Sequence, residues 1–180
     1  MGFPTVKKEL NKMTKEQIVN LVEELYKKQS SVREYLDFFV NPNQDKLLEK
    51  YKKKIDNAFY TRMGNPKIDL KAAKKATSDF SKLGVSGEYL AELYLHLAEI
   101  GTEFTQTFGD IDERFYLTIE NAFYEGLQVM QNEGILDKFR DRIDQLETNA
   151  QGIGWGFSDT MTSIYWQFCA DDVDEETDNE

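Results

Sequence analysis

The most chemically suggestive residues of this 180-residue chain are four polar side chains at helical spacing. Three glutamates and the single histidine recur so that one face of a helix would carry them all: Glu92, His96, Glu99 and Glu103. Carboxylate and imidazole groups can bind transition metals, but a carboxylate-bridged iron site needs ligands from four helices and usually two Glu-x-x-His motifs. These positions also lie opposite the apolar face of their helix. We therefore expect a solvated face, with no metal and no other cofactor.

Residues for covalent or acid–base catalysis cannot be assembled from spacing alone. His96 could act as a general base, but a base needs a nucleophile and an orienting partner in the same pocket. The single cysteine, Cys169, precedes an acidic stretch and lacks the cationic surroundings of a reactive thiol. We expect a buried or inert cysteine, no catalytic residues and no enzymatic activity.

A glycine-rich segment near the C-terminal end is the best candidate for a small-ligand site. Backbone N–H groups that precede a helix can bind phosphate, but dinucleotide loops follow a strand and Walker loops end in Gly-Lys-[ST]. This segment follows a helix, contains no lysine and runs into Asp159. The sequence favours a structural turn that buries Trp155 and Phe157. The alternative is a ligand-binding loop made of Gly152, Gly154, Trp155, Gly156 and Phe157.

Charge is distributed unevenly along the chain, whose net charge is −11. Residues 1–87 carry 18 basic and 11 acidic side chains, whereas residues 88–180 carry 4 and 22. The best basic surface is a stripe opposite the apolar face of one predicted helix, made of Lys71, Lys74, Lys75 and Lys82. Such a stripe is often merely solvated, but it could meet phosphates or an acidic protein. Because arginine is scarce in this half, we favour a protein partner over nucleic acid.

Composition and cysteine content are typical of a folded cytoplasmic protein. The apolar content of 40% is enough to form one compact domain or two small ones. The sequence contains no apolar run of about eighteen residues, so we expect no membrane span. It also shows no charged-then-apolar leader. These features predict a cytoplasmic location.

Helices must position all of these side chains, because apolar residues recur at helical spacing along eight to nine segments. Short linkers favour antiparallel neighbours, and no run alternates like a strand. The sequence predicts an all-α fold, either an irregular antiparallel bundle or a short superhelix of about eight to nine helices. We expect one domain over residues 1–169, with a possible subdomain boundary near 62–69. The stretch 170–180 is predicted to be a disordered acidic tail.

Several short motifs, spread over roughly residues 5–168, resemble an uncharacterised all-helical bacterial family catalogued as a domain of unknown function. They include Lys7-Lys8-Glu9-Leu10, Glu34-Tyr35-Leu36-Asp37-Phe38 and Leu136-Asp137-Lys138-Phe139. The resemblance implies a compact helical protein, and it brings no catalytic residues.

We therefore expect a non-enzymatic interaction or scaffold domain with an unknown protein partner, or one that associates with itself by pairing its basic half with its acidic half. One alternative is nucleic-acid binding through residues 1–87. The other is a small-ligand binder or enzyme that uses the loop from Gly152 to Phe157.

Overall fold

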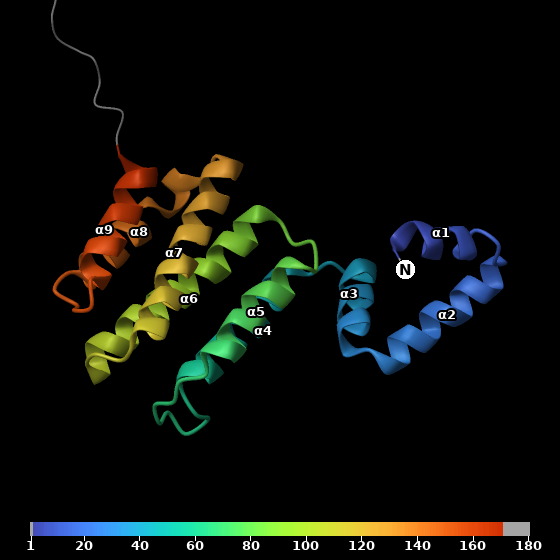
Figure 1. Ribbon diagram of the computed structural model, residues 1–180, viewed down its shortest axis with the longest axis horizontal. Helices are drawn as coiled ribbons and strands as arrows, with labels where there is room; N and C mark the ends of the chain where they lie inside the picture. The colour runs from blue at the N-terminus through green and yellow to red at the C-terminus, as the bar shows by residue number, and fades with distance from the viewer. Residues whose placement is uncertain (1, 171–180) are drawn as a thin grey trace, which may run out of the picture. The chain divides into compact units, whose positions relative to one another are not determined.

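The computed structural model describes residues 2–170, and these residues form nine α-helices and no strand (Figure 1). The all-α prediction is confirmed. The helices are α1 (Phe3–Leu10), α2 (Lys15–Lys28), α3 (Ser30–Val40), α4 (Gln44–Phe59), α5 (Leu70–Ser81), α6 (Gly87–Phe108), α7 (Glu113–Glu133), α8 (Leu136–Ala150) and α9 (Phe157–Cys169). Almost all of the predicted acidic tail, residues 171–180, lies outside the described residues.

The chain divides into two compact units, the first ending at Asn43 and the second beginning at Gln44. The segment 62–69, which we considered as a possible boundary, lies inside the second unit and connects α4 to α5. Two backbone bonds hold it against the end of α4: Lys67 N–H donates to the Phe59 carbonyl, and Asp69 N–H donates to the Ala58 carbonyl. The Asp69 side chain then caps α5 by accepting from Ala72 N–H at 2.9 Å. This loop is therefore closely tied to both helices.

The first unit consists of α1, α2 and α3. A capping box starts α2, because Thr14 Oγ1 accepts from Gln17 N–H and Gln17 Oε1 accepts from Thr14 N–H. Gln29 is extended and separates α2 from α3. Near this junction the Tyr26 hydroxyl donates to Asp37 at 2.8 Å. No residue between positions 2 and 43 is buried, so this unit has helices but no core.

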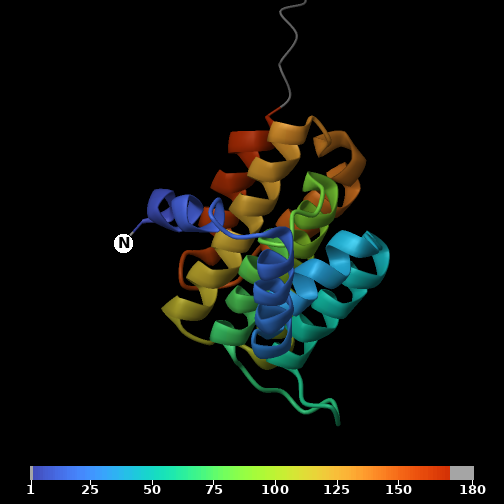
Figure 2. The same cartoon turned by 90° about the vertical axis from the view of Figure 1, so that its right-hand side faces the viewer.

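The second unit is built around the antiparallel pair α6 and α7, which Figures 1 and 2 both show side by side. Helices α4 and α5 pack on one side of this pair, and α8 and α9 pack on the other. Gly101 permits close approach of the two helices, because a Cβ there would lie 2.1 Å from Ile119 Cδ1 of α7. Buried aromatic rings fill the adjoining core, namely Phe59, Phe104, Phe115, Tyr116 and Phe157.

Candidate functional site

The face of α6 that carries Glu92, His96 and Glu99 is half-buried, so the expectation of a solvated face is wrong for these three residues. The Glu92 side chain is only 18% exposed. Lys52 Nζ of α4 donates to Glu92 Oε1 at 2.6 Å, and Arg142 of α8 donates to Glu92 Oε2 at 2.5 Å. The physical reason is that α4, α5, α7 and α8 all contact α6, and together they cover its polar face as well as its apolar one.

Ion pairs extend this cluster along α6. Arg142 forms a bidentate pair with Glu99, with N···O distances of 2.9 and 2.8 Å, and His96 Nε2 lies 2.7 Å from Asp56 Oδ1 of α4. Burial acts to raise the pKa of Glu92, but the hydrogen bonds from Arg142 and Lys52 outweigh it and leave the pKa below its ordinary value. The cluster therefore joins α4, α6 and α8 electrostatically.

The same cluster borders a cleft, and it shows no arrangement of metal ligands among the described residues. Glu103 is exposed at the edge of the group. Among the described residues, no three His, Cys, Asp or Glu side chains are arranged to hold a metal ion. A cleft of about 480 Å³ lies beside His96, and no Ser, Thr, Cys or Lys lines it. Its lining residues are Asp56, His96, Glu99, Ile100, Glu103, Arg142, Gln145, Leu146 and Asn149.

The glycine-rich segment forms a tight turn, but only part of the prediction for it is correct. Phe157 is fully buried and packs on Tyr116, with ring centroids 5.1 Å apart. Trp155 is instead 65% exposed, and its φ of +60° places it in the left-handed region. A Cβ on Gly154 would lie 3.3 Å from the Asp110 carboxylate. This acid and Asp159 in the first turn of α9 disfavour an anionic ligand at the loop.

The lysine stripe lies where we predicted, on the exposed side of α5. Lys71, Lys74, Lys75 and Lys82 are all exposed, and Ala73, Ala76 and Phe80 on the opposite side are buried. Lys75 forms an ion pair with Asp79 at 2.6 Å. Lys74 and Lys82 make no ion pair among the described residues.

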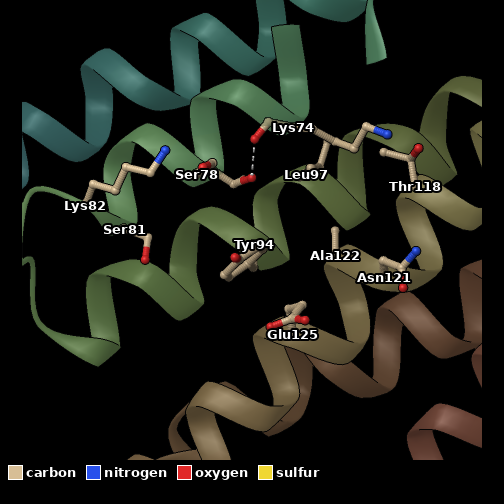
Figure 3. A pocket seen from close by; sticks show the side chains of 11 residues that line it. Lys74, Ser78, Ser81, Lys82, Tyr94, Leu97, Thr118, Asn121, Ala122 and Glu125 are labelled. Atoms are coloured by element: carbon tan, nitrogen blue, oxygen red, sulfur yellow. Dashed lines mark hydrogen bonds between the residues drawn. The ribbon is translucent and has the colours of Figure 1, made fainter. Parts of the chain in front are cut away.

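Lys74 and Lys82 border a groove of about 360 Å³ between α5 and α7, with α6 beneath it (Figure 3). The α5 wall contains Lys74, Thr77, Ser78, Ser81 and Lys82, the floor includes Tyr94 and Leu97 of α6, and the α7 wall contains Thr118, Asn121, Ala122 and Glu125. Figure 3 shows the two lysines at opposite ends of the α5 wall. The lysines were predictable from sequence, but the groove was not, because three helices form it.

Neutral polar groups occupy much of the space between the charged residues. Thr77 donates to the Lys74 carbonyl, and Thr118 donates to the Arg114 carbonyl, so both hydroxyl protons are used within their own helices. Burial and the nearby Glu125 raise the pKa of Tyr94, which stays a neutral phenol at physiological pH. The groove thus combines two ammonium groups with one carboxylate and an apolar floor.

Residues 1–169 match the model of a family described as a family of unknown function, DUF6155. The chain belongs to that family. This match confirms the resemblance that the sequence motifs indicated. No curated protein and no solved structure matches this DUF6155 chain significantly. Within the described part of the DUF6155 chain, no helix is both long enough and apolar enough to cross a membrane.

Proposed function

We propose that this DUF6155 chain is a non-enzymatic interaction domain whose groove between α5 and α7 binds an acidic, extended segment of a protein partner. One observation carries the proposal: the groove has Lys74 and Lys82 at the two ends of one wall, without ion pairs in the described chain, above a floor that includes Leu97. Unpaired cations around an apolar depression complement a ligand that is acidic and partly apolar.

The spacing of the lysines suggests the pattern of the ligand. Lys82 is the C-cap residue of α5 and keeps a helical backbone eight residues after Lys74, a separation of about 12 Å at 1.5 Å per helical residue. An extended chain covers about 13 Å in four residues, and its residues i, i+2 and i+4 point to the same side. Two acidic residues four positions apart can therefore reach both lysines, while an apolar residue midway between them contacts the floor.

Two features favour a protein segment over nucleic acid. The groove lining contains no arginine, and Glu125 on the α7 wall would repel a chain with a phosphate at every residue. Binding is favoured over hydroxyl- or thiol-based covalent catalysis because no Ser, Thr or Cys lines the cleft beside His96 and because Cys169 is buried.

The test uses a fluorescein-labelled peptide, Gly-Glu-Gly-Leu-Gly-Glu-Gly, in a fluorescence-polarisation titration against the full chain at low salt. Lys74→Glu/Lys82→Glu should weaken binding by at least about tenfold, equivalent to about 1.4 kcal/mol. The matched control is Lys53→Glu/Lys67→Glu, which makes the same charge change at exposed sites outside the groove and should bind like the wild type. Ser78→Trp should also weaken binding, because it fills the groove without changing its charge.

Three results would overturn the proposal. The wild-type chain could fail to bind the peptide at low salt. The groove and control variants could lose affinity equally, which would indicate nonspecific attraction to basic charge. A labelled thymidine oligonucleotide could bind more tightly than the peptide and depend on Lys74 and Lys82, which would assign the groove to nucleic acid.

A further inference from the structure

The first unit exposes apolar side chains that folded domains normally bury. Between positions 2 and 43 no residue is buried, and the Val22 and Phe39 side chains are 39% and 73% exposed. Helix α2 has 14 residues and α3 has 11. Isolated helices of about this length are only marginally stable in water. Helices of this length are usually stabilised by burying an apolar face against another element. This unit therefore needs a partner surface.

The arrangement of α2 and α3 leaves their apolar faces accessible. The bonds that join the two helices lie near their junction: Tyr26 with Asp37, and Arg33 with the carbonyls of Tyr26 and Lys27. Figure 1 shows the helices diverging from that point. Each helix carries an apolar stripe, formed in α2 by Ile18, Leu21, Val22 and Leu25, and in α3 by Val32, Tyr35, Leu36 and Phe39.

Both stripes have a spacing that reads the same in either direction, at i, i+3, i+4 and i+7. When two copies of α2 lie antiparallel about a twofold axis between Leu21 and Val22, Ile18 of one copy faces Leu25 of the other. Such an isologous contact pairs apolar residues in every layer. Two hairpins joined in this way bring together four helices, which can form a bundle with a shared core.

The charges of this unit are nearly balanced. Residues 1–43 carry seven basic and six acidic side chains, so two copies do not repel each other strongly. Lys15 faces Lys28 in the antiparallel register, but Lys28 already forms an ion pair with Glu24 of its own helix. We propose that α2 and α3 form a homodimer interface, in which the apolar stripes of two copies of this chain bury each other.

The first experiment measures the mass of the full chain by light scattering after size exclusion. We expect twice the 20.9 kDa of one chain, and a dimer that persists at high salt because its contact is apolar. Val22→Asp should weaken dimerisation by at least about 100-fold, since the twofold axis brings two buried carboxylates together. Asn20→Asp is the matched control, because it adds the same charge at an exposed position on the polar face of α2 and should leave the dimer intact.

A second measurement covers the case in which Val22→Asp only unfolds the unit. Position 22 lies beside the proposed twofold axis. A Val22→Cys variant should therefore form a disulfide between two chains under mild oxidation, whereas an Asn20→Cys variant should not. A monomer at all concentrations, a dimer that dissolves in salt, or a dimer unaffected by Val22→Asp would each overturn the inference. Monomeric chains that bind anionic lipid vesicles through α2 would also overturn it.

Discussion

The close approach of α6 and α7 makes Gly101→Ala the most direct test of the core. The added Cβ would lie 2.1 Å from Cδ1 and 2.5 Å from Cγ1 of Ile119, which is fully buried. Carbon atoms in contact are separated by about 3.5–4.0 Å, so Ile119 or the helix must move by about 1.5 Å. Overpacking of this kind costs about 1–3 kcal/mol, and the better helix propensity of alanine returns about 1 kcal/mol. We expect a net loss of up to about 2 kcal/mol.

Gly126→Ala is the matched control, because it replaces a buried helical glycine in the same helix pair. Its Cβ would approach Tyr94 Cβ no closer than 3.3 Å, a contact that a small shift can relieve. Both variants gain the same helix propensity, so the difference between them isolates the clash at Ile119. We expect Gly101→Ala to be about 1–3 kcal/mol less stable than Gly126→Ala.

Urea unfolding followed by far-UV circular dichroism measures this difference. Adding Ile119→Val to Gly101→Ala removes Cδ1, the nearer clashing atom, and should recover part of the lost stability. If Gly101→Ala were as stable as Gly126→Ala, our account of the α6–α7 contact would be refuted.

Two further predictions concern the polar cluster and the glycine-rich turn. Because the folded pKa of Glu92 lies below its unfolded value of about 4.3, the stabilisation from this residue is present above that pH and is lost as the pH falls through the folded pKa. Glu92→Gln should therefore have a lower free energy of unfolding than the wild type near pH 7. In urea unfolding near pH 3, the difference in unfolding free energy between the two proteins should be smaller. A difference that stays constant between these pH values would contradict the ion-pair account. In the turn, Phe157→Ala should cost about 3–5 kcal/mol, whereas Trp155→Gly should change the unfolding free energy by less than about 1 kcal/mol, and the opposite order in the same assay would show that Trp155 seals the core.

Local signals in the sequence were sufficient to predict the helices and several of their contacts. The Thr14 capping box and the Asp69 cap involve residues three positions apart, so their hydrogen bonds follow from the sequence itself. The exposed lysines of α5 follow from helical periodicity. Gly101 could be recognised as a site of close approach because it lies on the apolar side of α6.

The periodicity of apolar residues indicates which face of a helix is apolar, but it does not predict how many other helices will pack against that helix. For this reason the ion pairs of Glu92, which come from α4 and α8, and the groove beside Lys74, which needs α6 and α7, emerged only when distant segments packed together. Trp155 differs from expectation for a related reason. Its backbone is left-handed and lies between two glycines, and its side chain is exposed whereas Phe157, two residues later, is buried. The sequence alone determined the family, the helices and the charged stripe, whereas tertiary packing decided which polar side chains are buried, which are paired and which remain available to a partner.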